Sequence, residues 1–143
     1  PNDIMSGDKK VCGVLIENMF KGSSLHASII GIGLNVNQAK FQNLPKAASL
    51  FQISGTTYNL EDVLSICLDH IREKMELLNR PEEQIIRLYE SFLYRIGKPS
   101  TFESDGSLFT GIIRGVNLQG LLKVQLEDNQ RVLFDLKSIK LKN

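Results

Sequence analysis

The chain has 143 residues, of which 42% are hydrophobic and 23% are charged, and this balance excludes disordered, collagen-like and low-complexity proteins. Its length is enough for one ordinary domain, or for a modest domain with a small appendage. Seventeen lysines and arginines against 16 acidic residues leave a net charge of +1. Because so small a charge cannot neutralise a phosphate backbone, we expect no nucleic-acid partner for this chain.

The cysteines and the apolar runs indicate a cytoplasmic location. Cys12 and Cys67 are far apart and have no partners at metal-ligand spacing, so the sequence indicates neither a disulfide framework nor a zinc site and favours a reducing compartment. The longest apolar run, residues 27–36, is interrupted by two glycines and is far shorter than the roughly 20 residues of a membrane span. We therefore expect no membrane partner. Because the chain begins with Pro1, we also expect it to be part of a longer protein.

The first third of the chain predicts a β-hairpin. Two apolar runs, residues 11–16 and 28–36, lie on either side of the small polar segment 21–24, which predicts a connecting loop longer than a tight turn. The second run is nearly continuous in apolar character, as is typical of a strand covered on both faces. Residues 38–56 show no periodicity and predict a loop with a short helix.

Two amphipathic helices are expected next. Apolar residues recur at helical spacing from Leu60 to Asn79, and Asn59 is the expected N-cap,. Pro81 is expected at the first turn of the second helix, which we expect to end at residues 97–99,. Both helices are expected to cover one face of a sheet.

After Pro99 the composition changes to short apolar runs separated by turn-rich segments,. The expected strands are 100–103, 108–116, 121–126, 131–134 and 139–141. Five short strands in such a short segment predict a small, partly open β-barrel. The predicted fold class is therefore α+β, with a partial mixed or antiparallel sheet covered by helices and then the barrel.

A carboxylate and an ammonium group are candidates for one end of the predicted hairpin. Asp3 precedes the lysine pair by a few residues, and Lys10 enters the strand directly. Such a pair could hold Mg²⁺ on the acid and a phosphate on the base. The alternative is an ordinary surface turn with solvated lysines.

Glycines inside the predicted strands are the second candidate feature. Gly31, Gly33 and Asn35 alternate and so share one face, and Gly13 adds a bare position in the other strand,. Glycine weakens a strand and leaves its backbone open to close approach. This stripe predicts either a pocket for a flat ligand or tight packing of a helix, and the pattern leaves both open.

Three segments together resemble biotin protein ligases. The family motifs are Lys-Trp-Pro-Asn-Asp, Lys-x-x-Gly-Ile-Leu-x-Glu and Gly-x-Gly-x-Asn-x-Asn. Segments 1–3, 10–17 and 31–37 match them in order and spacing, beginning inside the first motif. Residues 109–120 are similar to the SH3-like C-terminal module of the family. The resemblance covers nearly the whole chain and implies residues 1–96 as part of the catalytic domain and 97–143 as the SH3-like domain.

The resemblance implies an ATP-dependent biotin-[acetyl-CoA-carboxylase] ligase. Such an enzyme forms biotinyl-5′-AMP from biotin and MgATP and then transfers biotin to a lysine of a biotin carboxyl carrier domain. The implied catalytic residues are Lys10 and Asp3, with Asp3 as the Mg²⁺ ligand. The implied biotin contacts are Lys10, Gly13, Leu15, Gly31 and Gly33, and the implied nucleotide contacts are Asn2, Val14, Asn35 and Lys142.

The chain also departs from the family pattern. The arginine-rich loop Gly-Arg-Gly-Arg-x-Gly-Arg, which precedes these motifs in the family, is absent, and Lys142 stands where an arginine is usual. We therefore expect this chain to be inactive without an N-terminal part of the ligase, and to expose an apolar sheet edge. A homodimer is a further expected partner. The alternatives are a non-catalytic binding module and an enzyme resembling lipoate ligase.

Overall fold

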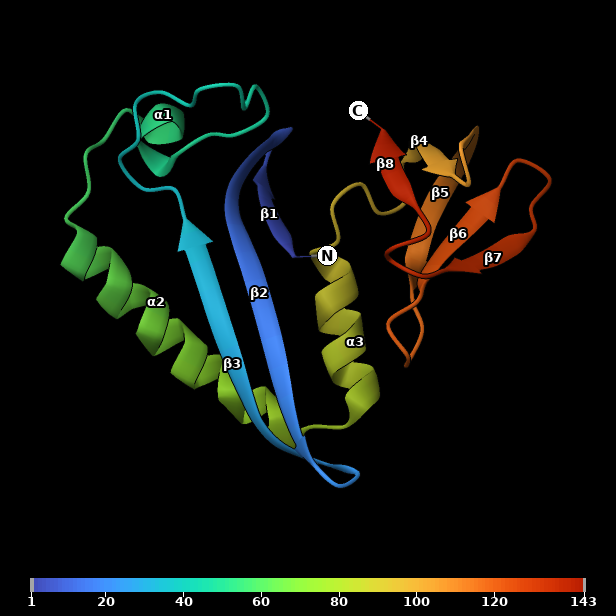
Figure 1. Ribbon diagram of the computed structural model, residues 1–143, viewed down its shortest axis with the longest axis horizontal. Coiled ribbons are helices and arrows are strands. Elements are labelled where there is room, and N and C mark those ends of the chain that lie inside the picture. The colour runs from blue at the N-terminus through green and yellow to red at the C-terminus, as the bar shows by residue number, and fades with distance from the viewer. Residues whose placement is uncertain (1, 143) are drawn as a thin grey trace. The chain divides into compact units, whose positions relative to one another are not determined.

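The computed structural model describes residues 2–142, so Pro1 of the first motif lies outside the described residues. The chain divides into two compact units, Pro1–Ile71 and Arg72–Asn143. Each unit is built around one antiparallel sheet, coloured blue and orange to red in Figure 1. Two antiparallel sheets with a few helices confirm the predicted α+β class. Within residues 2–142 no helix is both long and apolar enough to span a membrane.

The first sheet has three strands in the order β1-β2-β3. β1 (Asp3–Ser6) was not predicted, whereas β2 (Lys9–Lys21) and β3 (Ser24–Leu34) confirm the hairpin and extend it. The loop is tighter than predicted, because Lys21 pairs with Ser24 and leaves two turn residues. Gly22, the first of them, has a φ of 64°, and a left-handed glycine at this position is what a type II′ hairpin turn requires.

A β-bulge interrupts the pairing of β1 with β2. Ile4 pairs with Cys12, but its neighbour Met5 pairs with Lys10. Val11 is therefore the extra residue on β2. A bulge of this kind changes which side chains share a face of the strand, and it therefore changes the surroundings of Lys10.

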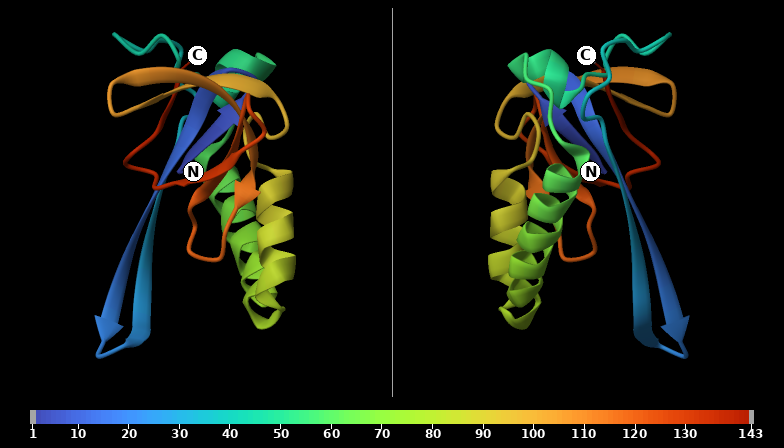
Figure 2. Two further views of the ribbon diagram at one scale, coloured as in Figure 1. Left: turned by 90° about the vertical axis from the view of Figure 1, so that its right-hand side faces the viewer. Right: turned by 90° about the vertical axis from the view of Figure 1, so that its left-hand side faces the viewer.

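The hairpin is apolar and exposed, contrary to the expectation that its second strand is covered on both faces. Adjacent residues of a strand point to opposite faces, and Ile29 is 56% and Ile30 49% exposed. Within the first unit the extensive contacts of β3 are with β2 alone. In the described order β1-β2-β3, β3 is an outer strand of the sheet, and its exposed isoleucines confirm the predicted apolar edge. Figure 2 shows the long β2–β3 ribbon.

The buried apolar residues that the structure describes in the first unit lie at the base of this hairpin. Val11 and Cys12 are buried there with Val36 and Ala48. The chain between β3 and α1 (Leu50–Ser54) forms the predicted loop and short helix. Ser49 is fully buried and caps α1, since its hydroxyl accepts a hydrogen bond from the backbone of Gln52 at 3.1 Å,.

The predicted helices form with small differences in their ends. α2 (Leu60–Met75) continues as the 3₁₀ turn η1 (Glu76–Asn79), and Asn59 caps it by accepting a hydrogen bond from the backbone of Glu61 at 2.8 Å. α3 (Glu82–Ser91) follows Pro81 as predicted. It ends before residue 97, because the backbone then forms successive tight turns. None of the three helices contains a fully buried residue, and α3 contacts β5 of the second sheet.

All five strands predicted after Pro99 are present, in the order β7-β6-β5-β4-β8. They are β4 (Pro99–Ser104), β5 (Ser107–Val116), β6 (Leu122–Leu126), β7 (Arg131–Phe134) and β8 (Lys140–Lys142). The core contains Phe102, Ile113, Val124 and Ile139. Among the described strands the outer pair, β7 and β8, are not joined, so the barrel is open.

Glu90 connects α3 to the second sheet. Its carboxylate accepts a hydrogen bond from the backbone of Val116 at 2.8 Å. The neighbouring Gly115 has a φ of 128° at a β-bulge in β5, and a Cβ there would lie only 2.0 Å from the Glu90 carboxylate. Glycine is therefore required at residue 115 for this contact.

Candidate functional site

An ion pair stands at the base of the first sheet. Lys10 Nζ lies 2.6 Å from Asp3 Oδ1, and the two side chains are 44% and 47% exposed. Asp3 comes from β1 and Lys10 from β2, so the sheet itself brings the two groups together. A partly exposed pair like this is accessible to a charged ligand, and each member can exchange its partner for a ligand group.

The bulge at Val11 places Lys10 on the same face as the glycines. In a regular strand Lys10 and Gly13 would point to opposite faces. Here a Cβ on Gly13 would lie 3.4 Å from Lys10 Nζ, so the lysine side chain extends over that glycine. The extra residue at the bulge accounts for this change of face,.

The glycines form an uncovered strip beside the ion pair. Gly33 pairs with Gly13 and Gly31 pairs with Leu15, so the four residues lie on one face. A Cβ on Gly33 would meet only Gly13 O at 3.7 Å, and one on Gly31 would meet only Leu15 atoms, at 3.8 Å and beyond. Leu15 is 62% exposed. Within the first unit no described helix packs on this strip, which leaves it open to a flat ligand.

The asparagines of the third motif hold the following loop. The Asn35 side-chain amide donates a hydrogen bond to Ala48 O at 3.1 Å. Asn37 donates to Tyr58 O at 2.8 Å and accepts from Tyr58 N at 2.9 Å. The structural role of Asn37 and the capping role of Ser49 were not predicted, although the Ser-x-x-Gln pattern from Ser49 to Gln52 is a sequence signal for a cap. Contact of Asn35 with the adenylate stays a prediction.

Asn2 and Val14 are joined through their backbones, since Val14 N donates a hydrogen bond to Asn2 O at 2.7 Å. Val14 alternates with Gly13 and Leu15, so its side chain lies on the other face from the glycine strip. The structure thus brings Asp3, Lys10, Gly13, Leu15, Gly31 and Gly33 together on one face, and only the backbone of Val14 belongs with them.

Lys142 belongs to the second unit, where it pairs with Glu103. Its ammonium donates a hydrogen bond to Glu103 Oε2 across β8 and β4. This hydrogen bond and the positive charge of Lys142 lower the pKa of the Glu103 carboxyl below its ordinary value of 4.5,. The contact of Lys142 with nucleotide phosphates stays a prediction.

Cys12 is a packed thiol rather than a reactive group. It is 2% exposed, and burial raises its pKa above the ordinary value of 9.0. A thiol with a raised pKa carries little of the thiolate that reacts as a nucleophile. Cys12 therefore acts as a small apolar core residue,.

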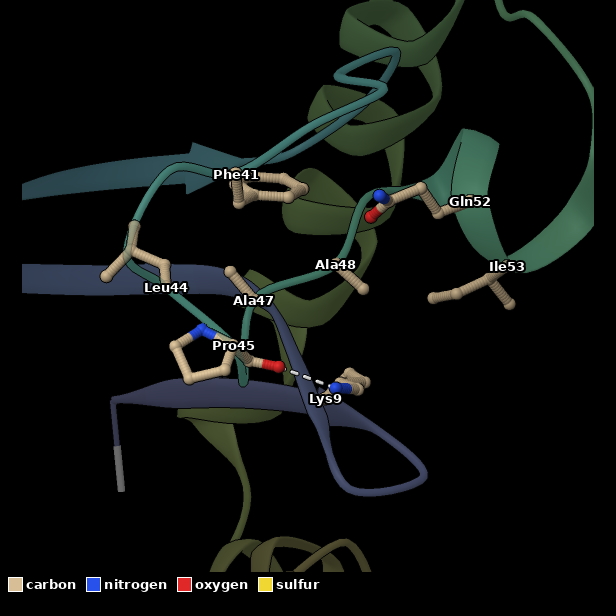
Figure 3. Close-up of a pocket in the computed structure, with 8 residues that line it drawn as sticks. All are labelled: Lys9, Phe41, Leu44, Pro45, Ala47, Ala48, Gln52 and Ile53. Atoms are coloured by element: carbon tan, nitrogen blue, oxygen red, sulfur yellow. Dashed lines mark hydrogen bonds between the residues drawn. The ribbon is translucent and has the colours of Figure 1, made fainter.

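A shallow pocket of about 420 Å³ lies beside Lys9, on the loop before α1. Figure 3 shows apolar side chains around it and the hydrogen bond that Lys9 donates to Pro45 O at 2.6 Å. Its lining residues are Lys9, Phe41, Leu44, Pro45, Ala47, Ala48, Gln52 and Ile53. None of the predicted site residues lines this pocket.

Asp3 is the predicted metal ligand. Among residues 2–142 no group of three or more acidic, histidine or cysteine side chains is placed to hold a metal ion. Mg²⁺ commonly takes only one or two carboxylates, with water and substrate phosphates as its other ligands. A single carboxylate at Asp3 fits that kind of site, in which the nucleotide supplies most of the ligands.

No protein-family model matches the chain. Among curated proteins it is similar to the bifunctional ligase/repressor BirA of Bacillus spizizenii, at 29% identity over 139 residues. The matched region is 94% of this chain and 43% of that protein. The chain therefore spans less than half the length of this relative and corresponds to its C-terminal portion.

Solved structures give the same result. The apo structure of the biotin protein ligase from Aquifex aeolicus is similar to this chain at 26% identity, with a TM-score of 0.75. The match covers all of this chain and 63% of the Aquifex chain. The same ligase in complex with biotin and ATP matches at 26% identity with a TM-score of 0.74, over 60% of that chain. The resemblance predicted from the three motifs is thereby confirmed.

Proposed function

We propose that this chain is the C-terminal part of a biotin protein ligase, which joins biotin to ATP as biotinyl-5′-AMP and then transfers biotin to a lysine of a carrier domain. The observation that carries the proposal is the Asp3–Lys10 ion pair beside the uncovered glycine strip. The similarity to a ligase whose structure holds biotin and ATP supports it.

The glycine strip fits the flat ring system of biotin. Without side chains at Gly31 and Gly33, a ring can lie directly on the backbone of β3,. The exposed side chain of Leu15 adds apolar contact on the neighbouring strand,. Because Lys10 Nζ lies over Gly13 at the end of the strip, a ligand in this orientation directs its carboxylate toward the ammonium group.

Lys10 then stabilises charge during adenylate formation. A carboxylate oxygen of biotin attacks the α-phosphorus of ATP, the new O–P bond forms, and the bond to pyrophosphate breaks. Negative charge builds on the phosphoryl oxygens, where a positioned ammonium is most effective. In the second step the amine of the acceptor lysine attacks the acyl carbon, loses a proton, and AMP leaves. Asp3 holds Lys10 in place before the anionic substrates replace it as partners.

Asp3 would also hold Mg²⁺, which neutralises phosphate charge when it is bound. The nucleotide is expected to lie near Asn2, Asn35 and the backbone of Val14, and Lys142 is the proposed contact of its phosphates. The acceptor is expected to be the biotin carboxyl carrier domain of acetyl-CoA carboxylase, and the cytoplasm is the expected location of both proteins.

The site is expected to work only with an N-terminal part of the ligase. Some apolar residues on each face of the hairpin are more than half exposed, including Leu15 at 62% and Ile16 at 56%. Soluble proteins rarely leave such contiguous apolar area uncovered. We propose that the N-terminal part covers it and supplies the cationic loop. A homodimer is a further proposed partner, and residues 1–96 and 97–143 are the proposed domains.

A biotin-dependent exchange of pyrophosphate into ATP tests the proposal. The 143-residue chain is assayed alone and together with the N-terminal part of the same ligase. We expect exchange only in the mixture and only with biotin. A mixture that associates but gives no exchange would identify a non-catalytic binding module, and exchange that responds to lipoate and not to biotin would identify a lipoate ligase.

A further inference from the structure

On the edge of β2 away from β1, Lys10 is bonded to a loop segment and not to β3. The pairing of β2 with β3 begins only at Cys12. Beyond it, Lys10 N donates a hydrogen bond to Lys46 O at 2.7 Å, and Lys10 O accepts one from Ala48 N at 2.9 Å. We name residues 46–48 the lysine support. This segment runs parallel to β2 where the two meet, and Figure 3 shows it beside the start of that strand.

The position of the Lys10 ammonium depends on this contact. Lys10 lies next to the bulge at Val11, where the regular ladder of hydrogen bonds to β1 is interrupted. The lysine support therefore fixes the Lys10 main chain at a point where the sheet alone holds it less firmly. A misplacement of about 1 Å can cost a hundredfold in rate, so a residue that fixes this main chain contributes to the reaction without touching a substrate.

Ser49 follows the lysine support directly and holds it in place. The side chain of Ser49 is fully buried. Its hydroxyl donates a hydrogen bond to Gln38 O at 2.7 Å and accepts one from Gln52 N at 3.1 Å. The Gln52 side chain accepts a hydrogen bond from Ser49 N at 3.2 Å and donates one to Ala39 O at 2.9 Å. These four bonds tie the start of the loop to its end at α1, with the lysine support between them.

Asn35 also holds the lysine support, but it is exposed to a competing role. Its side-chain amide donates a hydrogen bond to Ala48 O at 3.1 Å, and its carbonyl accepts one from Leu50 N at 2.9 Å. Asn35 is the proposed neighbour of the nucleotide, so a ligand can draw its amide away. The hydrogen bonds of Ser49 are internal to the loop and closed to solvent, so they persist when substrates bind.

We propose that Ser49 is a positioning residue for Lys10. Through the lysine support it keeps the Lys10 main chain where the ammonium lies over Gly13, at the end of the glycine strip. Ser49 itself touches no substrate, because its side chain is fully buried. The inference rests on the proposed ligase function, since the charge that Lys10 stabilises develops only during adenylate formation.

Amide hydrogen exchange of the 143-residue chain, followed by NMR, tests the structural step. Ser49→Ala removes the cap of α1 and leaves Gln38 O without its donor. We expect the amides of Lys10 and Ala48 to exchange about fivefold faster or more, as loss of an N-cap predicts for local opening. Protection of the Val124 amide, in the second unit, should be unchanged.

Ser54→Ala is the matched control for this measurement. Ser54 lies at the other end of α1, and its hydroxyl donates a hydrogen bond to Leu50 O at 2.9 Å. The substitution therefore also removes a hydroxyl that bonds to the backbone of the same helix, but not one that is bonded to the start of the loop. It should leave the hydrogen exchange of Lys10 and Ala48 unchanged.

Biotin-dependent pyrophosphate exchange by the complete ligase tests the catalytic step. Ser49→Ala should lower the maximal rate by about fivefold or more and leave the KM for ATP unchanged, because the weakened interaction acts in the transition state. In a ligase that also carries Lys10→Ala, Ser49→Ala should lower the residual rate no further, since residues that act through one another are not additive. Gln52→Ala, which removes the exposed half of the capping box, should act in the same direction and replaces Ser49→Ala if that variant does not fold.

Three results would overturn the proposal. One is unchanged hydrogen exchange at Lys10 and Ala48 in a folded Ser49→Ala chain. Another is an equal fractional loss of rate with and without Lys10, because Ser49 would then support the fold in general and not Lys10. These two results leave the proposed function standing. The third is a wild-type complete ligase without biotin-dependent pyrophosphate exchange, in which case the proposed function fails and this inference fails with it.

Discussion

Gly111 is a glycine whose replacement should destabilise the protein by a predictable mechanism. In the structure a Cβ at this position would lie 2.5 Å from Val124 Cγ1 and 3.2 Å from Gln125 O. Carbon atoms in good contact are about 3.5–4.0 Å apart, so the substitution Gly111→Ala requires a shift of roughly 1 Å. Val124 is fully buried and Phe102 is 1% exposed, so neither has free space to move into.

The expected cost of Gly111→Ala is about 1–3 kcal/mol, the range typical of an overpacked core. For a unit of this size, each kcal/mol lowers the melting temperature by about 4–8 °C. Differential scanning calorimetry of the purified chain measures the shift. The matched control is Gly33→Ala, because a Cβ there would meet only Gly13 O at 3.7 Å and a strand favours alanine over glycine by up to about 1 kcal/mol. Equal melting temperatures for the two variants would refute the packing argument.

Three further changes test other parts of the structure. Gly33→Val should leave the fold intact but weaken biotin binding to the complete enzyme by at least about tenfold, and unchanged affinity by calorimetry would show that the strip does not hold the ring. Lys142→Ala should return the lowered pKa of Glu103 toward 4.5 in an NMR titration. Because the pKa of Glu103 is lowered in the folded state, the ion pair stabilises the fold above pH 4.5, and this stabilisation is lost as the pH falls through the lowered pKa,. The free energy of unfolding of the variant should therefore be lower than that of the wild type at pH 7 and equal to it in acid. Glu90→Ala should lower the melting temperature by several degrees, since Val116 N loses its acceptor,, whereas Glu82→Ala, on the exposed first turn of the same helix, should not.

Much of the fold could be predicted because its signals are local. Alternating and continuous apolar runs bounded by turn residues located the hairpin and the five later strands, and Asn59 and Pro81 located the starts of the two helices,. β1 was missed because its four residues, Asp3–Ser6, are too few to show a period.

The geometry of the site depends on a β-bulge that the sequence does not show. Simple alternation places Lys10 on the same face as Cys12, and the bulge at Val11 moves it to the face of Gly13. A bulge results from pairing between two strands, so it has no signature in β2 alone. The continuous apolar character of β3 predicted a strand covered on both faces, and this prediction was wrong, since Ile29 is 56% and Ile30 49% exposed. Whether a strand is covered depends on what packs against it, which its own sequence does not show.

The measurement that tests the central claim most directly is biotin-dependent pyrophosphate exchange by the complete ligase carrying Lys10→Ala. Lys10 is 44% exposed, so its loss should leave the circular dichroism spectrum unchanged while exchange falls by at least about a hundredfold. Lys9→Ala is the matched control, since Lys9 bonds to Pro45 O and not to Asp3, and it should retain exchange. If Lys10→Ala exchanges pyrophosphate as fast as the wild type, Lys10 does not stabilise the adenylate, and the account of this site is wrong.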